Sequence, residues 1–337
     1  MILHIMIVEK FLAPFIDFVD SNFGRGEHKY VFITSEKYHY GLTPEHNVEF
    51  LHTDDGIFIT LLKYMKEASK IILHGLWRDK VDLLLVQNPG LFKKCYWIMW
   101  GGDFYYPDKQ SDIRKKVIKR MGYIVNYTDG DYELAKKWYG AKGNRIKCFC
   151  YTSNLYKSLE VSQHKENSVN ILVGNSADPS NNHIDIFDKL EKFKDQEINI
   201  YAPLSYGDQV YAKKIIEEGK LCFGQKFKPL TEFLPFDKYL ELLGKIDIAI
   251  FNHSRQQAMG NIRTLIGLGK KVYMRDDVTT FDSLKNDGIK VFNLNEIELE
   301  PEFDEKFDNQ KKIKSIFSEQ NLIACLSDVF GFQGRIR

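Results

Sequence analysis

The sequence predicts an α/β protein built from two doubly wound domains. Short apolar runs alternate with amphipathic stretches along the chain, which favours repeated strand–helix units and a mainly parallel sheet. Residues 153–168 interrupt this alternation, and because they are polar and patternless we interpret them as a linker. A length of 337 residues also suits two domains. We therefore expect two Rossmann-like domains facing a cleft, since such folds bind ligands beyond the carboxyl ends of their strands.

The first domain is expected over residues 1–152. Its predicted strands are Leu3–Val8, Tyr30–Thr34, Ile71–His74, Cys95–Trp100, Tyr123–Tyr127 and Ile146–Cys150. Helical spacing lies between most of these strands, for example at Asp131–Tyr139.

The second domain is expected over residues 169–312. Its predicted strands are Asn170–Val173, Ile198–Tyr201, Ile246–Phe251, Lys271–Met274 and Lys290–Phe292. Its predicted helices are His183–Phe193, Gln209–Glu218, Asp237–Leu243 and Met259–Leu268. A tail over 313–337 follows. Its stretch Ile313–Phe330 is helical in pattern, and the sequence leaves it free to pack back on the first domain.

Composition excludes several classes of protein. The formal net charge is only +1, so we expect no nucleic-acid partner. The five cysteines form no CxxC pair, and we interpret them as buried thiols of a reducing cytosol rather than as disulfides or a zinc site. The first apolar run lacks a basic leader, and no run approaches the roughly 18 apolar residues of a membrane span. The sequence therefore predicts a cytoplasmic protein or one on the cytoplasmic side of a membrane.

The strongest local signal follows the first strand of the second domain. The strand stops at Gly174 and continues through small polar residues into a helix that Ser180 or Asn181 can cap. Free backbone N–H groups at such a helix start favour binding of a phosphate or a sugar carbonyl. An ordinary, well-capped strand–turn–helix explains the same residues equally well.

A second polar loop follows the predicted strand Ile246–Phe251. It contains Arg255, two glutamines, Gly260 and Asn261. An arginine with carboxamides at a helix start suits a leaving diphosphate, and Gly260 permits close backbone approach. Taken alone, this loop is better explained as a polar surface loop. Two such loops at strand ends of one domain favour a nucleotide-sugar site.

A third loop, Tyr201–Asp208, also follows a strand. Tyr201 or Tyr206 is placed to stack on a base or a sugar face, and Gly207 permits a tight turn. A purely structural turn is an equally good interpretation.

Two candidate bases lie in the first domain. Asp103 ends the segment Trp97–Asp103, where a carboxylate facing the cleft would take a proton from an acceptor hydroxyl. The alternative is a turn in which Asp103 caps the next segment. His74 stands at another predicted strand end and is the second candidate, although a lone histidine is more often structural.

The segment 112–122 is basic and amphipathic. It can lie on an anionic membrane leaflet or be a solvated helix face. Its basic residues are Arg114, Lys115, Lys116, Lys119 and Arg120, and its apolar residues are Ile113, Val117, Ile118 and Met121.

Asp129 and Asp131 have the DxD spelling of a divalent-cation site. They follow Thr128 at the start of a predicted helix, where aspartates are expected as caps, so we predict no metal site.

Together these segments resemble the bacterial 4-acetamido-4,6-dideoxygalactose (Fuc4NAc) transferases, glycosyltransferase family 56. The resemblance covers most of the chain and is densest over residues 171–268. It rests on Trp100-Gly-Gly-Asp103, Ile171–Ser176 with Asp178, Ser180, Asn181 and His183, Phe236–Leu243, and Arg255-Gln-Gln257 with Gly260. The family's WGAD reads Trp-Gly-Gly-Asp here, and the first 90 residues match loosely apart from His74-Gly75.

The resemblance implies a GT-B fold and a dTDP-activated donor, such as dTDP-Fuc4NAc, bound by the second domain without a cofactor. The implied donor-site residues are Gly174, Asn175, Ser176, Asp178, Ser180, Asn181, His183, Tyr201, Tyr206, Arg255, Gln256, Gln257, Gly260 and Asn261. Arg255 and helix N-termini would meet the charge that grows on the diphosphate. A base, Asp103 or His74, is needed only if the anomeric centre inverts, which the sequence leaves open.

The implied acceptor is an undecaprenyl-diphosphate-linked glycan at the inner leaflet of the bacterial inner membrane. We therefore expect a peripheral membrane protein whose acceptor side includes Trp100 and the Arg114–Arg120 stretch. The loose match of the first 90 residues leaves the pathway open between common antigen, O-antigen and capsule. Two other functions fit the nucleotide site: a nucleotide-sugar 2-epimerase, which would need more carboxylates, and a non-catalytic nucleotide-sugar-binding protein, which would not need Asp103.

Overall fold

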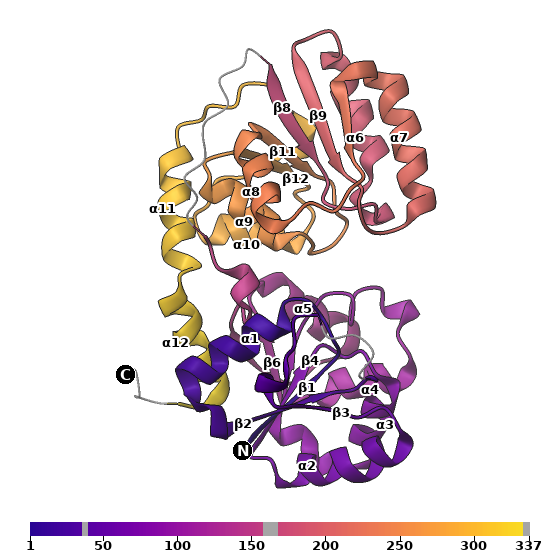
Figure 1. Ribbon diagram of the computed structural model, residues 1–337, viewed down its shortest axis with the longest axis vertical. Coiled ribbons are helices and arrows are strands. Elements are labelled where there is room, and N and C mark those ends of the chain that lie inside the picture. The colour runs from indigo at the N-terminus through magenta and orange to yellow at the C-terminus, as the bar shows by residue number, and fades with distance from the viewer. Residues whose placement is uncertain (36–39, 158–167, 333–337) are drawn as a thin grey trace. The chain divides into compact units, whose positions relative to one another are not determined.

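The computed structural model describes residues 1–35, 40–157 and 168–332 (Figure 1). Of Phe236, only the backbone is described. The chain forms two compact units. Unit 1 comprises Met1–Leu155 and Glu319–Arg337, and unit 2 comprises Tyr156–Ser318. The predicted linker 153–168 falls largely on 158–167, which lie outside the described residues.

Unit 1 is built on a parallel sheet in which seven strands are described, in the order β3-β2-β1-β4-β5-β6-β7. The strands are β1 (Ile2–Met6), β2 (His28–Phe32), β3 (Val48–Phe50), β4 (Lys70–His74), β5 (Cys95–Ile98), β6 (Tyr123–Asn126) and β7 (Asn144–Lys147). The helices are α1 (Leu12–Val19), α2 (Leu62–Glu67), α3 (Asp79–Gln87), α4 (Asp112–Arg120), α5 (Asp129–Tyr139) and α12 (Glu319–Phe330). The strand order reverses between β1 and β4, which makes this point the topological switch of the sheet.

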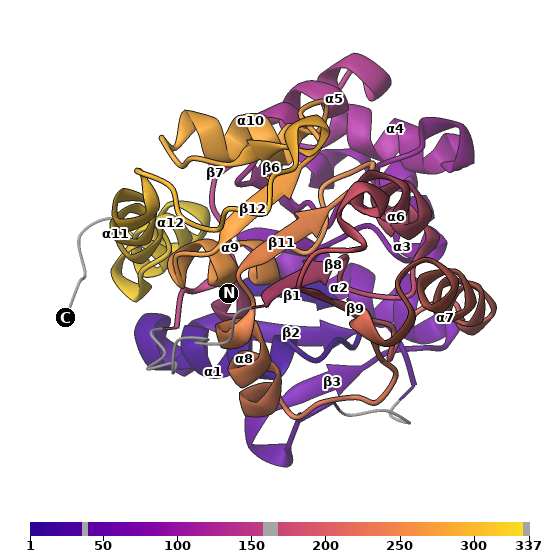
Figure 2. The same ribbon diagram turned by 90° about the horizontal axis from the view of Figure 1, so that it is seen from above.

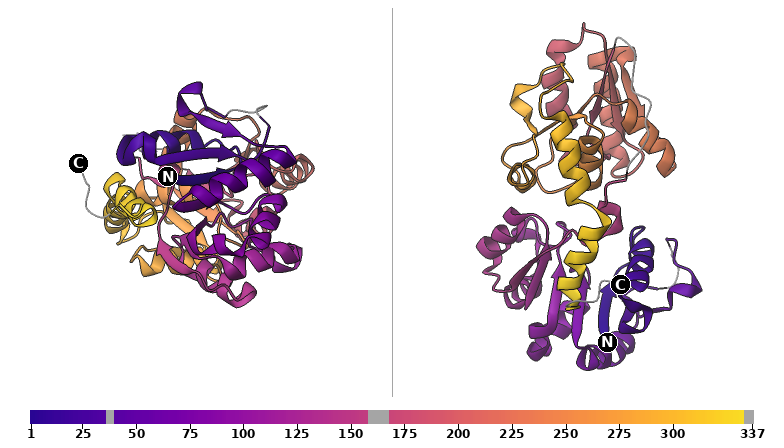
Figure 3. Two further views of the ribbon diagram at one scale, coloured as in Figure 1. Left: turned by 90° about the horizontal axis from the view of Figure 1, so that it is seen from below. Right: turned by 90° about the vertical axis from the view of Figure 1, so that its left-hand side faces the viewer.

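The two faces of this sheet carry different side chains, because successive residues of a strand point to opposite faces. One face is apolar: Leu3, Leu73 and Trp97 pack in a buried cluster with residues of α2 to α5. The other face carries His4 and His74, which are buried under α1 and α12. Figure 3 shows α12 lying along unit 1.

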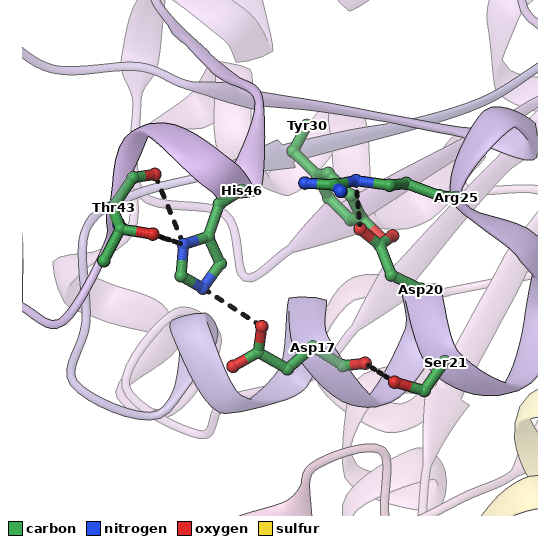
Figure 4. A network of polar contacts seen from close by, with 7 residues as sticks. All are labelled: Asp17, Asp20, Ser21, Arg25, Tyr30, Thr43 and His46. Carbon is green, nitrogen blue, oxygen red and sulfur yellow. Dashed lines mark hydrogen bonds and ion pairs between the residues drawn. The ribbon is translucent and has the colours of Figure 1, made fainter.

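Helix α1 is tied to its surroundings by polar contacts at its carboxyl end (Figure 4). The Asp17 carboxylate lies 3.3 Å from Nε2 of His46, and the Nδ1 atom of His46 accepts a hydrogen bond from the backbone N–H of Thr43. The Tyr30 hydroxyl, from β2, donates to Asp20 at 2.8 Å. These contacts fix α1 over the histidine face of the sheet.

Unit 2 repeats the architecture, with described strands in the order β10-β9-β8-β11-β12-β13, all parallel. Figure 2 shows β9, β8, β11 and β12 side by side. The strands are β8 (Val169–Val173), β9 (Ile198–Pro203), β10 (Phe227–Leu230), β11 (Ile248–Phe251), β12 (Lys271–Met274) and β13 (Phe292–Asn293). The helices are α6 (His183–Leu190), α7 (Gln209–Phe223), α8 (Phe236–Lys245), α9 (Met259–Gly267), α10 (Thr279–Asn286) and α11 (Lys306–Ile316).

The predicted α/β fold with two doubly wound sheets is confirmed. The stretch Ile313–Phe330, which the sequence predicts as helical, forms the end of α11 and the whole of α12, with a break between Ile316 and Glu319. The break occurs at the buried Phe317, whose carbonyl accepts a hydrogen bond from the backbone N–H of Tyr156 instead of continuing a helix. Within the described residues, no helix is both long and apolar enough to cross a membrane.

Candidate functional site

Three predicted loops meet at the switch point of unit 2, between β8 and β11. The backbone N–H of Gly174, directly after β8, donates to the carbonyl of Ile250 in β11 at 3.0 Å, so these two strand ends are adjacent. The loop after β9 joins them, because Ala177 pairs with Gly207 in a parallel bridge. The sequence placed each loop at a strand end, and the sheet order brings all three together.

The inner layer of this site is a framework centred on Asn181, which is fully buried. Its Oδ1 atom accepts hydrogen bonds from the backbone N–H of Asn175 and from Nε2 of His253, both at 2.9 Å. Its Nδ2 group donates to the Ser176 hydroxyl at 3.3 Å and to the Asp178 carbonyl at 2.9 Å. One carboxamide therefore fixes most of the Gly174–Asp178 loop.

Three residues that were predicted to contact the donor belong to this framework instead. Ser176, Asn181 and His183 have exposed fractions of 2%, 0% and 0%, so they support the loop from beneath and do not form its outer surface. Gly174 packs directly on two of these residues, Asn181 and His183. It has φ of +68°, and a Cβ atom there would lie 2.7 Å from both Asn181 Oδ1 and His183 Nε2. The close packing of the loop on the framework therefore requires glycine.

The outer layer connects the three loops through side chains. The Ser180 hydroxyl donates to Oε1 of Gln257 at 2.8 Å, and Nε2 of Gln257 donates to Oδ1 of Asn175 at 3.3 Å. Nδ2 of Asn175 donates to the Tyr206 hydroxyl at 3.0 Å. The Tyr206 residue is 47% exposed, so its ring is available for stacking while its hydroxyl is held. Tyr201 lies inside β9, two residues before the strand ends, and so is not part of the loop.

Gly207 allows the loop after β9 to touch the loop after β8. It has φ of +108°, and a Cβ atom would lie 2.7 Å from the carbonyl carbon of Ala177. The backbone N–H of Ala177 donates to the Tyr206 carbonyl at 2.8 Å, and that of Asp208 donates to the Ala177 carbonyl at 3.1 Å. Gly207 therefore lies in a parallel bridge with Ala177, and its close approach to the neighbouring backbone requires glycine.

Helix α9 presents its amino end to the same site. The preceding residue, Ala258, has φ of +56°, and no side chain caps the helix. Gly260 and Asn261 lie in its first turn, and Nδ2 of Asn261 donates to the Tyr239 hydroxyl at 2.9 Å. Uncapped first-turn N–H groups and the helix dipole favour an anion at this position.

Charge at the site comes from Arg255, which is half-buried and donates to the Gln256 carbonyl at 3.2 Å. Burial alone would raise the pKa of Asp178. Hydrogen bonds from Ser180 and the charges of Arg255 and His253 outweigh burial, so the pKa of Asp178 is lowered. Arg255, the carboxamide of Gln257 and the uncapped start of α9 thus follow one another along a partly exposed stretch of chain, and groups of this kind can hold a diphosphate and stabilise it as it leaves.

In unit 1 the expectation that Asp103 faces a cleft is wrong. The carboxylate is fully buried, and Oδ2 accepts hydrogen bonds from the backbone N–H of Leu76 at 3.0 Å and from Nε1 of Trp97 at 2.7 Å. Oδ1 accepts from the backbone N–H of Trp100 at 3.2 Å. Burial raises the pKa of Asp103, although these hydrogen bonds oppose that rise. The carboxylate therefore holds together the turns that follow β4 and β5.

His74 is also enclosed, and it belongs to a chain of hydrogen-bonded rings. Its Nδ1 atom lies 2.8 Å from the Tyr151 hydroxyl, and its Nε2 atom lies 3.0 Å from Nδ1 of His4. Nε2 of His4 lies 2.8 Å from Nδ1 of His28. At the other end, Nε1 of Trp100 donates to Tyr151 at 2.7 Å. One set of tautomers connects the chain in a single direction: Tyr151 accepts from Trp100 and donates to Nδ1 of His74, and His74 and His4 each donate from Nε2 to the next ring.

These buried histidines make unit 1 sensitive to acid. Burial lowers the pKa of His74 to about 3 and of His28 to about 4, and it also lowers the pKa of His4. The unfolded chain takes up these protons near pH 6.5. Since the unfolded state then binds more protons, the free energy of unfolding falls as pH drops below 6.5, by up to about 1.4 kcal/mol per pH unit for His74 and for His28 until their folded-state pKa values are reached, and His4 adds to the fall. Urea unfolding at pH 7, 6 and 5 measures this loss, and a stability that stays constant over this range would contradict it.

One of the five predicted basic residues of the segment 112–122 is not on the surface. Arg114 is buried and forms an ion pair with the buried Asp82, so it is not on the surface. Val117, Ile118 and Met121 are buried in the core, so Ile113 is the one partly exposed apolar residue of the four and a broad apolar face for a membrane is lacking in this helix. Lys116, Lys119 and Arg120 are exposed, and Lys115 is half-exposed beside Asp112.

The two aspartates with DxD spacing lie in the first turn of α5, as predicted. Asp131 is buried and accepts a hydrogen bond from the Tyr105 hydroxyl at 2.6 Å. Asp129 forms an ion pair with Arg145.

Three residues of the unit 2 site were missed by the sequence analysis. His253 supports Asn181, Tyr239 holds Asn261, and the Asn252 carbonyl accepts from Nδ2 of Asn182 at 2.8 Å. The first polar residues after a buried strand were the available signal for Asn252 and His253. Tyr239 carried no such signal, because its place in the site depends on how α8 packs.

Comparison with known proteins gives the family of the chain and its fold. The sequence model of the family described as 4-alpha-L-fucosyltransferase, glycosyl transferase group 56, matches residues 9–324. A glycosyltransferase from Rickettsia africae superposes with a TM-score of 0.66 at 11% identity, covering 98% of this chain and 97% of that chain. Anabaena HepE in complex with UDP gives 0.68 at 11% identity, with coverage of 98% and 99%. WaaG, a glycosyltransferase involved in lipopolysaccharide biosynthesis, gives 0.64 at 13% identity, with coverage of 98% and 99%. At these identities the likeness shows the fold, which is GT-B.

Proposed function

Because the chain belongs to glycosyl transferase group 56, it is a hexosyltransferase, and we propose that it moves a 4-acetamido-4,6-dideoxyhexose from a dTDP-sugar to an undecaprenyl-diphosphate-linked glycan. The family description names fucosyl transfer, and fucose shares the 6-deoxy carbon with the proposed sugar. The pathway would be the synthesis of a bacterial surface polysaccharide, either common antigen or O-antigen.

The observation that carries the donor side of this proposal is the hydrogen-bonded link between the three loops of unit 2. Ser180, Gln257 and Tyr206 form the exposed part of one surface and are joined through the buried Asn175, with Arg255 on the loop of Gln257. We assign the diphosphate to Arg255 and the first turn of α9, and stacking of the base or sugar to Tyr206. Ser176, Asn181, His183 and His253 act as positioning residues beneath this surface.

In this mechanism the protein's own groups meet the charge of the leaving diphosphate. As the bond between the anomeric carbon and the phosphate oxygen breaks, negative charge grows on the diphosphate. The Arg255 guanidinium provides two-point hydrogen bonding to phosphate oxygens, and the α9 dipole adds to it. Both are in place before the reaction, so little reorganisation opposes the transition state.

The acceptor is assigned to the carboxyl-end surface of unit 1. Phe11, Trp77 and Trp100 are half-buried there, with ring centroids of Trp77 and Trp100 5.8 Å apart and those of Phe11 and Trp100 5.1 Å apart. Such aromatic faces suit stacking against a sugar. Asp103 holds the backbone of Trp100, and the chain through Tyr151 and His74 holds its indole, so we propose Asp103 and His74 as positioning residues for this surface.

We further propose that Lys116, Lys119 and Arg120 bring the protein to the anionic inner leaflet. Since α4 offers no broad apolar face, this contact is electrostatic and weakens with salt, at about 1 kcal/mol per basic residue. Co-sedimentation with phosphatidylglycerol vesicles at low and high salt tests it. Binding that survives reversal of all three charges would refute this assignment.

A thermal-shift panel with dTDP, UDP, GDP and CDP tests the donor assignment. A nucleotide near 100 times its dissociation constant stabilises a protein by about 2.7 kcal/mol. We expect this from dTDP, with the other three producing smaller shifts. Equal or stronger stabilisation by UDP would overturn the dTDP assignment while leaving the glycosyltransferase site in place.

A further inference from the structure

Two cysteines that are far apart in the sequence meet in unit 1. The sulfur atoms of Cys148 and Cys325 lie 2.6 Å apart across 177 residues of chain. Cys148 directly follows β7, and Cys325 is in the middle of α12, which packs against β7. The backbone N–H of Cys150 donates to the sulfur of Cys148 at 3.3 Å, and the Cys325 thiol donates to the Leu322 carbonyl at 3.4 Å.

This placement is close to what a disulfide requires. The sulfur atoms of a disulfide are about 2.05 Å apart, so an approach of roughly 0.5 Å would complete the bond. The remaining cysteines are placed differently. The Cys95 thiol donates to the Leu91 carbonyl at 3.3 Å, the Cys150 thiol is directed at the Cys148 carbonyl at 3.7 Å, and Cys222 lies in unit 2.

We propose that Cys148 and Cys325 form a reversible disulfide when the protein meets a low-molecular-weight disulfide such as oxidised glutathione. Cys325 is half-exposed, whereas Cys148 is 2% exposed, so Cys325 reacts first. Its thiolate attacks one sulfur of glutathione disulfide and releases one glutathione thiolate. The Cys148 thiol then loses its proton and attacks the Cys325 sulfur, and the second glutathione leaves as thiolate. Both cysteine sulfurs are oxidised, and one glutathione disulfide is reduced to two glutathiones.

The disulfide would join the two segments through which the chain leaves unit 1 and returns to it. The chain leaves unit 1 after Leu155 and returns to it at Glu319. Cys148 lies shortly before the first of these points and Cys325 shortly after the second. A disulfide between them would close all of unit 2 into one covalent loop and fasten α12 to unit 1.

The surroundings of the thiols set the speed of this reaction. The pKa of the Cys325 thiol is raised by its hydrogen bond with Cys148 and by burial, and the pKa of Cys148 is raised by burial. Thiolate is the reactive form, so exchange is slow at neutral pH and accelerates as pH rises.

The test uses the full-length protein at pH 8 with excess oxidised glutathione. After the reaction is quenched with acid and free thiols are alkylated, peptides are mapped by mass spectrometry without reduction. We expect one dominant cross-link, between the peptides of Cys148 and Cys325, which reduction removes. The Cys325→Ser variant should lose it, and Cys222→Ser, a control in unit 2, should form it at the unchanged rate. A dominant Cys148–Cys150 link, or glutathione that remains on Cys325 without a cross-link, would overturn the proposal.

A second measurement needs no substitution. Because closing a long loop restricts the unfolded chain, the oxidised wild-type protein should melt about 5 °C or more above the reduced one. Adding dithiothreitol should reverse the difference. Identical melting of cross-linked and reduced protein would show that the bond does not fasten α12.

Discussion

Replacing Arg255 by alanine is expected to lower kcat/KM for sugar transfer by about 100–1,000-fold, the loss typical when one preorganised group facing a developing anion is removed. Arg255 is half-buried on the loop after β11, next to Gln257 and the uncapped start of α9. The α9 dipole and backbone N–H groups would remain in the variant, so some transfer should persist. Initial rates at varied donor concentration, with acceptor saturating, measure the effect.

Two further variants separate charge from geometry at this position. Arg255→Lys keeps the positive charge but loses the planar fork that bonds two phosphate oxygens, so an intermediate rate is expected. Arg25→Ala, at an exposed arginine that lies 3.5 Å from Asp20 in unit 1, serves as the matched control and should transfer at the wild-type rate. If Arg255→Ala binds nucleotide and transfers sugar like wild type, the diphosphate assignment is wrong.

Replacing Asp103 by asparagine is expected to lower the free energy of unfolding by about 2–4 kcal/mol. The carboxylate accepts hydrogen bonds from Leu76, Trp97 and Trp100, all of which are donors. An asparagine has only one oxygen, so its amide group would meet at least one N–H and leave it without an acceptor. Urea unfolding followed by tryptophan fluorescence measures this loss.

The same variant distinguishes a positioning role from a catalytic one. If Asp103 is a positioning residue, Asp103→Asn should lower the stability, and the KM for acceptor should rise because Trp100 loses its support. Asp108→Asn, at an exposed aspartate of the following turn, should change neither. Unchanged stability together with an unchanged KM and a turnover about 100-fold lower would return Asp103 to the role of base.

The fold was predictable because buried parallel strands are short continuous apolar runs. The two strands that the sequence analysis missed lie at sheet edges. β3 is only Val-Glu-Phe and half-buried. β10 contains Pro229, which has no N–H to donate and is tolerated here because an edge strand has a neighbour on one side only. At both places the apolar signal is weak because one side of the strand has no partner.

The candidate site was predictable as loops but not as individual roles. Strand ends at a switch point meet in any doubly wound sheet, so the loops of Gly174, Tyr206 and Arg255 could be assigned together. Whether a polar residue faces outward or supports the loop depends on packing that one sequence does not reveal. Asn181 is therefore framework, while Ser180 beside it lies on the surface.

The same limit applies to unit 1. The position of Asp103 at a strand end favoured a base, but its environment consists of hydrogen-bond donors brought there by the turns after β4 and β5. Arg114 belongs to a basic run in the sequence, and only the packing of α3 on α4 shows that it pairs with Asp82. A run of charged residues usually predicts an exposed helix face. The pattern does not show when one residue of the run forms a buried ion pair.

The central claim, transfer from a dTDP-sugar, is tested most directly by offering the protein dTDP-Fuc4NAc and UDP-sugars in parallel with an undecaprenyl-diphosphate-linked disaccharide and following the lipid product by mass spectrometry. The account predicts a product heavier by one 4-acetamido-4,6-dideoxyhexosyl residue, formed from the dTDP donor and strongly reduced in Arg255→Ala. Transfer from a UDP-sugar in its place, or consumption of the dTDP-sugar without any change in the lipid, would contradict it.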